Sequence, residues 1–276
     1  MKKLFILFLT ILFTSNLLAQ NLYEYEQKIA ECFSKSDYKC AEKYTLASIE
    51  LVGEDYNDLD RLYTNLGNIQ RRLGKKDAAL ISYNKAYDLN KSSYNTLANR
   101  ASLKRQMNDL EGSLRDYNLA LNIKPNDDEL LINRSYTKKM LGDTIGAEND
   151  LLAILEINPN NFQALTNLVN IRVYRGDYDF GLETYNKMIS EHPSEPILYN
   201  NRADLYLKMK NFEKALEDIN TAIKLGEKYD NAYVTKAEIL MAIGDRKQAL
   251  KNLQKAVKLG NNTTYVFELI DECTKY

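Results

Sequence analysis

Apolar residues recur along most of this chain at the i, i+3, i+4 spacing that places them on one face of a helix. One segment carries the complete face, formed by Ala215, Leu216, Ile219, Ala222 and Ile223. This spacing predicts a helix with one buried side. Helices of about 12 residues are marginally stable alone, so each must bury its apolar face against a neighbour. The pattern therefore predicts an all-α protein built from packed helices.

The predicted helices form a series with a fixed 34-residue period. A first helix ends each time at a turn position, and these positions recur in phase: Gly74, Asn108, Gly142, Gly176, Lys210 and Gly244. The first helices are predicted at 62–73, 96–107, 130–141, 164–175, 197–209 and 232–243. Gly or Asn at a helix end accepts the left-handed conformation, and an Asp or Asn that follows can cap the next helix. Each turn position therefore predicts a tight connection between two helices.

A second helix follows each turn position, for example at 78–90 and 214–225. It ends at Pro125, Pro159 or Pro193, which recur with the same period, or at a Leu–Gly pair. Small residues recur seven positions before and five positions after the turn, which predicts a close contact within each helix pair. They are Gly67, Ala101, Ser135, Ala203 and Ala237 on first helices, with Val169 the exception, and Ala79, Ser113, Ala147, Gly181, Ala215 and Ala249 on second helices.

A period of this size indicates one structural unit that is copied and stacked. The recurrent residues include Asn65-Leu66-Gly67, Asn201-Arg202-Ala203, Asp116-Tyr117-Asn118-Leu119-Ala120 and Ile123-Lys124-Pro125-Asn126. On these residues the chain resembles the tetratricopeptide-repeat family over 60–263, as six 34-residue units. Residues 22–59 resemble a degenerate helical hairpin of the same kind, and 264–276 resemble a C-terminal capping helix.

The resemblance implies a right-handed superhelical solenoid of stacked antiparallel helix pairs, with about six to seven units. It also implies that first helices face a concave groove, in which such proteins bind a protein or peptide. Some relatives bind a terminal carboxylate with a set of Lys, Arg and Asn side chains. That set is not assembled here, because Thr64, Glu129 and Asn133 stand where cations are expected.

The N-terminus has the layout of a secretory signal peptide over residues 1–19. Lys2 and Lys3 precede an apolar run from Leu4 to Phe13, and a small and polar stretch ends at Ala19. The alternative is a retained anchor, for which the apolar run is short. We expect export to a periplasm or the medium. Without the two lysines, 35 basic residues face 38 acidic ones, and this net charge of −3 favours attraction neither to nucleic acid nor to anionic membranes. No later stretch approaches a transmembrane length, so we expect no membrane insertion of the mature chain.

An exported chain meets oxidising conditions, which makes its three cysteines candidates for a disulfide. Cys32 and Cys40 lie four residues on either side of Ser36, which matches a turn position. This symmetry predicts a disulfide between them, and the alternative is two free thiols that face different ways. Cys273 is expected to pack in the last helix.

Motifs for chemistry are few. The single histidine, His192, precedes Pro193 in a predicted turn and is expected to be a solvated loop residue. The sequence has no zinc-ligand spacing, no phosphate-binding Gly-rich loop and no nucleophile elbow. We therefore predict no catalytic residue, no metal site and no cofactor.

One series of polar residues does suggest binding. An asparagine lies nine positions before most turn positions and should form a ladder along the groove: Asn65, Asn99, Asn133, Asn167 and Asn201. A carboxamide offers two donors and an acceptor, so such a ladder suits the backbone of an extended peptide. The alternative is that these residues are typical of the family and serve local packing.

Cations run beside the ladder. Arg71, Arg105 and Lys139 recur with the period of the turn positions, and Arg72 shares a helix face with Asn65. These cations predict a groove that attracts acidic groups, although cations near a helix C-terminus are also favoured by the helix dipole alone. Tyr174 on a first helix is a candidate for stacking on a ligand or for edge packing.

Together these features predict a non-catalytic scaffold that binds an extended peptide or protein segment in its groove through Asn65, Asn99, Asn133, Asn167, Asn201, Arg72, Arg105, Lys139 and Tyr174. One alternative is an accessory subunit of an envelope or secretion assembly, held by its convex face or its termini. Another is a carbohydrate-active or hydrolytic protein, which no motif favours.

Overall fold

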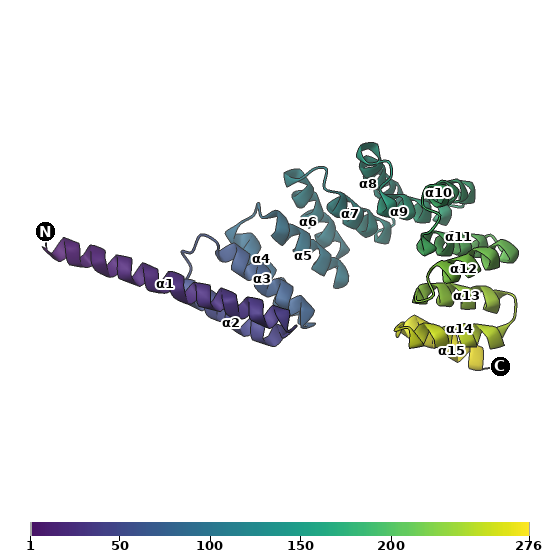
Figure 1. Ribbon diagram of the computed structural model, residues 1–276. Helices are drawn as coiled ribbons and strands as arrows, with labels where there is room; N and C mark the ends of the chain where they lie inside the picture. Colours follow the sequence, from purple (N-terminus) through teal and green to yellow (C-terminus); the bar gives the residue numbers. More distant parts are fainter. Residues whose placement is uncertain (1, 276) are drawn as a thin grey trace. The chain divides into compact units, whose positions relative to one another are not determined.

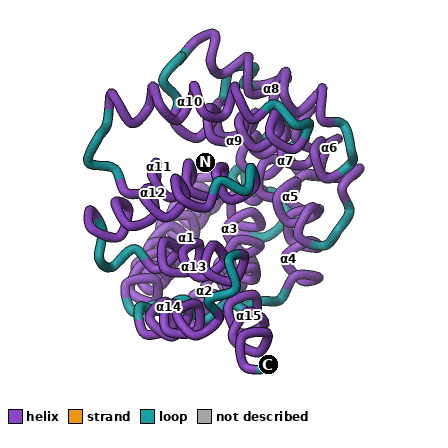
Figure 2. Tube along the Cα trace, turned by 90° about the vertical axis from the view of Figure 1, so that its right-hand side faces the viewer, coloured by secondary structure: helices purple, strands orange, loops and turns teal. Residues whose placement is uncertain are grey.

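The computed structural model describes residues 2–275, and it describes side chains from Leu18 onward. All regular elements in this range are helices, 15 in number, and Figure 2 shows them joined by short loops. Residues 2–19, within the segment predicted to be a signal peptide, form the first part of one helix. Its side chains up to residue 17 lie outside the described residues, so its cleavage stays a prediction.

The chain forms two compact units, divided between Asn161 and Phe162. The first contains α1 (Lys2–Ser34), α2 (Tyr38–Val52), α3 (Leu59–Arg72), α4 (Lys76–Leu89), α5 (Tyr94–Gln106), α6 (Leu110–Ile123), α7 (Asp128–Met140) and α8 (Thr144–Ile157). The second contains α9 (Phe162–Tyr174), α10 (Tyr178–Glu191), α11 (Pro196–Lys208), α12 (Phe212–Leu225), α13 (Asp230–Ala242), α14 (Arg246–Lys258) and α15 (Thr264–Thr274).

Each unit is a stack of helix pairs, as Figure 1 shows. Helices pack within the pairs α1/α2, α3/α4, α5/α6 and α7/α8 of the first unit, and within α9/α10, α11/α12 and α13/α14 of the second. Successive pairs stack, and α15 packs on α14 to close the second unit. First helices are neighbours as well, α3 with α5, α5 with α7 and α11 with α13. The predicted all-α superhelical repeat fold is confirmed, and the predicted helix limits are within three residues.

The turn positions have the predicted geometry. Backbone φ is positive at all six, from 57° at Lys210 to 91° at Gly176, and also at Ser36 in the N-terminal hairpin. The side chain that follows caps the next helix in every case but one: Asp37, Asp109, Asp143, Asp177, Asn211 and Asp245 each accept a backbone N–H. Lys75 makes no such cap. The period therefore follows from one turn geometry that recurs.

The small residues on paired helices are buried as predicted, and Val169 shows why the pattern tolerates an exception. A Cβ placed on Gly181 of α10 would lie 3.2 Å from Cγ1 of Val169 on α9. The side chain of Val169 on α9 is thus accommodated because Gly181, which faces it on α10, has no side chain. In the first unit, a Cβ on Gly67 would lie 2.6 Å from the ring of Tyr83 for the same reason.

A set of ion pairs that is absent from the predictions above recurs with the same period, each with a buried aspartate. The guanidinium of Arg100 donates two hydrogen bonds of 2.8 Å to Asp116 on the second helix of its own pair and one of 3.2 Å to Asn84 on the preceding pair. The same arrangement joins Arg134 to Asp150 and Asn118, and Arg202 to Asp218 and Asn186. Leu168 stands at this position in α9, where the second unit begins.

The N-terminal hairpin is fastened to the stack at its turn. Cys32 of α1 and Cys40 of α2 are joined by a disulfide, with their Cα atoms 5.7 Å apart. The buried Cys32 packs against Ala41 and against Ile69 of α3. Cys273 is a free thiol buried in α15. The long loop between Val52 and Leu59 is the place where the repeat period is interrupted.

Candidate functional site

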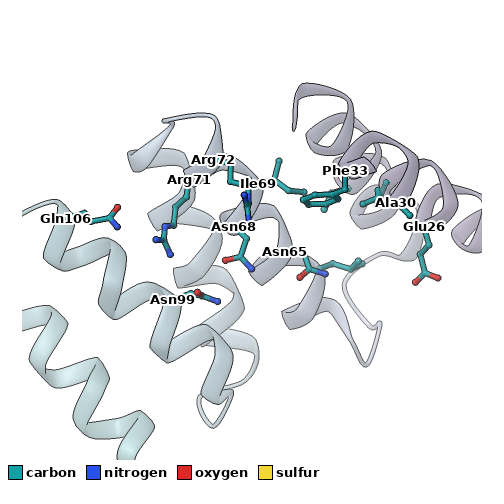
Figure 3. A pocket seen from close by; sticks show the side chains of 13 residues that line it. Glu26, Ala30, Phe33, Asn65, Asn68, Ile69, Arg71, Arg72, Asn99 and Gln106 are labelled. Carbon is teal, nitrogen blue, oxygen red and sulfur yellow. The ribbon is translucent and has the colours of Figure 1, made fainter. Parts of the chain in front are cut away.

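The first unit carries a hollow of about 910 Å³ between α1, α3 and α5, which we call the first hollow (Figure 3). Part of its lining is apolar and comes from Ile29, Ala30 and Phe33 of α1 and from Leu62 and Ile69 of α3. Figure 3 shows Phe33 next to Ile69, with Ala30 on the same side. Phe33 remains substantially exposed, so an incoming apolar side chain would gain burial by packing on it.

The rest of the lining of the first hollow is polar and cationic. Its residues come from α3 and α5: Asn65, Asn68, Arg71, Arg72, Asn99 and Gln106. Glu26 of α1 is the only carboxylate in the lining. The first hollow therefore combines an apolar wall with hydrogen-bond donors and two guanidinium groups.

A second hollow of about 260 Å³ lies next to it along the unit. It is bounded by residues of α3, α5, α6 and α7, among them Ser102, Tyr117, Glu129 and Asn133. Arg71 and Asn99 line both hollows. The two hollows are thus adjoining parts of one groove along the first helices of the unit.

Two core tyrosines lie next to residues of this groove, and their hydroxyl groups differ in hydrogen bonding. Tyr83 of α4 passes beside Gly67 and donates a hydrogen bond of 2.6 Å to Oδ1 of Asn68. Tyr117 of α6, one period later, is 1% exposed and its hydroxyl has no hydrogen-bond partner. Burial raises the pKa of Tyr117, and the charges of Arg105 and Arg71 together with the nearby Ser102 hydroxyl oppose that rise. A buried hydroxyl without a partner is rare and asks for an explanation.

The predicted asparagine ladder is only partly available for binding. Asn65 is exposed and Asn99 half-buried, and both line the first hollow. Asn133 lines the second hollow, but its carboxamide is already used: Nδ2 donates to the backbone oxygen of Glu129 at 2.9 Å, and Oδ1 accepts from Arg105 at 3.1 Å. For Asn133 the local packing interpretation is therefore the better one.

The predicted cations also differ in whether they are available to a ligand. Arg105 is bound to Asn133 and lies over the ring of Tyr136 at 4.9 Å, so its guanidinium links α5 to α7. Arg72 lines the first hollow and donates to the Tyr38 hydroxyl at 3.2 Å. Lys139 is exposed on α7 and lines neither hollow.

Three predicted residues belong to the second unit. Asn167 and Asn201 are half-buried on α9 and α11, and Tyr174, at the end of α9, is 76% exposed. Asn201 lies beside Asn200, whose Nδ2 donates to its Oδ1 at 3.5 Å. Because the chain divides before α9, Asn167 and Asn201 are members of a separate set from Asn65, Asn99 and Asn133.

Several groove residues were absent from the predicted site. The α1 wall could not be found from the repeat period, because α1 belongs to the degenerate hairpin. Arg71 belongs to the predicted cation series, but the predicted site contains Arg72 in its place. The ring of Tyr117 is buried in the core, and the residue also lines the second hollow.

Among the side chains that the structure describes, those of residues 18–275, no group of His, Cys, Asp or Glu is arranged to hold a metal ion. Over residues 18–275, no helix is both long and apolar enough to cross a membrane.

These features define a class: an all-helical repeat protein whose stacked pairs present first helices along a groove. Family models of the tetratricopeptide repeat match residues 60–93, 94–127, 196–229 and 230–262. A crystal structure of a tetratricopeptide repeat protein from Parabacteroides merdae is 33% identical, with a TM-score of 0.81 over 92% of this chain and 99% of that one. The chain therefore belongs to the tetratricopeptide-repeat family, whose members are protein–protein interaction scaffolds.

More distant structures share the fold alone. Pseudomonas aeruginosa pilF is 18% identical, with a TM-score of 0.55 over 78% of this chain and 99% of that one. YrrB, described as a TPR protein with an unusual peptide-binding site, is 21% identical, with a TM-score of 0.51 over 70% of this chain and 97% of that one. No curated protein sequence matches the chain.

Proposed function

We propose that the first unit binds an extended segment of another polypeptide in the groove formed by the two hollows. The observation that carries this proposal is that Arg71 and Asn99 line both hollows, so that one segment can contact both. The binding involves no chemistry on the segment. YrrB, which has the same fold, is described as having an unusual peptide-binding site, and this supports peptide binding in the groove.

The two sides of the groove have different roles in this proposal. An apolar side chain of the segment packs on Phe33, Ile29 and Leu62, where burial gives most of the affinity. The carboxamides of Asn65 and Asn99 hydrogen-bond the backbone of the segment, which needs no particular sequence. Specificity then comes from a few anchors and from the cations.

Selected peptides and matched variants test this proposal. Peptides of about 12 residues would be selected from a displayed library against the purified protein, and their dissociation constants measured by fluorescence polarisation. We expect Asn99→Ala and Arg71→Ala to weaken binding about tenfold, as loss of one anchor does. The control is Asn149→Ala, an exposed asparagine on α8 of the same unit.

Failure to select any peptide would contradict the proposal, as would equal binding by Asn99→Ala and Asn149→Ala. Loss of binding in Ile145→Asp, a highly exposed position on α8, with no loss in the groove variants, would favour the outer helices and an accessory-subunit role.

We also propose that the chain is exported and acts in a periplasm or the medium. The signal-like pattern at residues 1–19 supports this. Mass spectrometry of the protein from its own cells should find an N-terminus at Gln20 in an exported fraction. A chain that starts at Met1 in the cytoplasm would contradict it.

A further inference from the structure

We infer that the disulfide loop, residues 32–40, selects an aromatic side chain of the partner segment, which packs on Phe33 in the first hollow only while the Cys32–Cys40 bond is closed. This inference rests on the proposed function and adds to it the kind of side chain that the first hollow takes. The loop belongs to the N-terminal hairpin of α1 and α2, which precedes the 34-residue period.

The wall that α1 gives to the first hollow is held in place through α2. Helix α1 packs on α2, and α2 packs on α3. The Cys32–Cys40 bond joins α1 to α2 at their turn, and Cys32 is buried against Ile69 of α3. Phe33 directly follows Cys32 and lines the first hollow. The position of Phe33 relative to α3 therefore depends on the bond that joins the two helices of the hairpin.

Tyr38 connects the disulfide loop with the cationic part of the first hollow. Its ring meets the ring of Phe33 edge to face, with the ring centroids 5.9 Å apart. The guanidinium of Arg72 lies 5.3 Å from the centroid of the Tyr38 ring and donates to the Tyr38 hydroxyl at 3.2 Å. Phe33 and Arg72 line the first hollow (Figure 3), whereas Tyr38 does not. Tyr38 is thus a positioning residue for a phenyl ring and a guanidinium in the lining.

These two groups favour an aromatic side chain over an aliphatic one. Phe33 is 41% exposed, and a second ring can pack on it edge to face or offset. The guanidinium of Arg72 attracts the face of an aromatic ring. Both groups already make such contacts with Tyr38. The first hollow, about 910 Å³, has room for a ring with its adjoining backbone. The side chain that fits here is therefore a Phe, Tyr or Trp of the partner segment.

The disulfide makes this contact sensitive to a dithiol reductant. A thiolate of the reductant attacks the sulfur of Cys40, which is half-buried, and forms a mixed disulfide while the thiolate of the buried Cys32 leaves. The second thiol of the reductant then displaces Cys40 and closes the reductant's own disulfide. Two protons pass from the dithiol to the two cysteines. With the bond open, only the turn and packing join α1 to α2, and Phe33 is no longer fixed against α3.

Peptide variants measure the preference for an aromatic side chain. The probe is a 12-residue peptide selected from the displayed library that tests the proposed function. Each aromatic residue of the peptide is changed to alanine and to leucine, and dissociation constants are measured by fluorescence polarisation. We expect the selected peptides to share an aromatic residue, whose change should weaken binding about thirtyfold for alanine and about fivefold for leucine.

Variants of the protein show whether the disulfide loop is responsible. Phe33→Ala should weaken binding of the aromatic peptide to nearly that of the alanine peptide, and Tyr38→Ala should give part of this loss. Neither variant should change the affinity for the alanine peptide, which makes no use of Phe33. The control is Tyr23→Ala, at an exposed aromatic residue of α1 outside both hollows, which should keep the preference.

Reduction shows whether the closed bond is needed. The protein reduced with dithiothreitol, and the double variant Cys32→Ser with Cys40→Ser, should bind the aromatic peptide about tenfold more weakly and the alanine peptide unchanged. In Phe33→Ala, reduction should change the affinity for neither peptide. General loss of structure would instead weaken binding of both peptides in every variant.

Several results would overturn the inference: no shared aromatic residue among the selected peptides, equal affinity for the aromatic and leucine peptides, or a preference that persists in Phe33→Ala. A preference that reduction leaves intact, or equal loss of both peptides on reduction, would overturn it too. If the selected peptides still require Asn99 in these cases, the proposed function stands and only the role of the disulfide loop is wrong. If no peptide requires the groove, the proposed function fails as well.

Discussion

Arg105 on α5 donates to Asn133 on α7 through both terminal nitrogens, at 3.0 Å to its backbone oxygen and at 3.1 Å to its side-chain oxygen. Both residues were predicted to bind a ligand, and the structure uses them for each other. Repetition thus brings polar residues to one surface, but neighbours within that surface can satisfy one another. The groove is left to the residues that have no such neighbour.

The contact between Arg105 and Asn133 should contribute to stability. We expect Arg105→Ala to lower the free energy of unfolding by about 1.5 kcal/mol, because two hydrogen bonds from a charged donor and the packing on Tyr136 are lost. Urea denaturation followed by circular dichroism measures this. Lys139→Ala, at an exposed cation on α7, is the control and should change the value by less than about 0.5 kcal/mol. Equal effects would mean that Arg105 is solvated.

The buried ion pairs should contribute more to the free energy of unfolding than the contact between Arg105 and Asn133. Asp116 accepts from Arg100 and from Lys104 at 2.8 Å in a place almost without solvent. Removing it in Asp116→Ala leaves a buried guanidinium unpaired, and we expect a loss of about 3 kcal/mol or more. The matched exposed pair is Asp58 with Arg61, where Asp58→Ala should cost at most about 0.5 kcal/mol. A loss below about 1 kcal/mol for Asp116→Ala would show that the network is dispensable.

The disulfide should stabilise the N-terminal hairpin. Closure of an eight-residue separation corresponds to about 2.5 kcal/mol in the chain-entropy account. Cys32→Ser with Cys40→Ser, or reduction of the natural protein, should therefore lower the melting temperature. Intact mass without reductant should show a loss of two hydrogens and one free thiol, Cys273. Three alkylated thiols in the untreated protein would contradict the prediction.

Glu238 in the second unit should make stability depend on pH in an unusual direction. Burial raises the pKa of its carboxyl above the ordinary 4.5, and Asp204 adds to the rise, while the hydrogen bond from Tyr265 and the charge of Lys208 oppose it. A pKa higher in the folded than in the unfolded chain means that folding favours the protonated form. This contribution is present below the unfolded pKa and is lost as pH rises through the folded pKa.

Comparison with Glu238→Gln isolates this effect. As the pH is lowered from 7.5 to 4, the free energy of unfolding of the natural protein should rise relative to that of the Glu238→Gln variant. A difference that is constant, or that moves the other way, would show that burial does not control this carboxyl.

The fold was predictable because its determinants are local. Each turn needs a residue that tolerates positive φ, and each helix pair needs small residues that face each other. Both requirements recur every 34 residues, so both are visible in the sequence. Val169 and Gly181 show that even an exception follows the same geometry. The buried pair of Arg100 and Asp116 was missed although it has the same period, because a charge on a helix is more often solvated.

The candidate site was predictable only in part. Asn65 and Asn99 line the groove as expected, but the use of Asn133 by Arg105 depends on rotamers that spacing does not determine. The wall that contains Phe33 comes from the one hairpin outside the period. The division of the chain before Phe162 is also invisible in a repeat that continues without interruption.

The central claim is that a partner segment lies along the first helices of the first unit. A selected peptide that carries a photo-crosslinking residue, irradiated with the protein and mapped by mass spectrometry, tests this most directly. The account predicts adducts on α1, α3, α5 and α7, at or next to Phe33 and Asn99. Adducts confined to α4, α6 and α8 would contradict it.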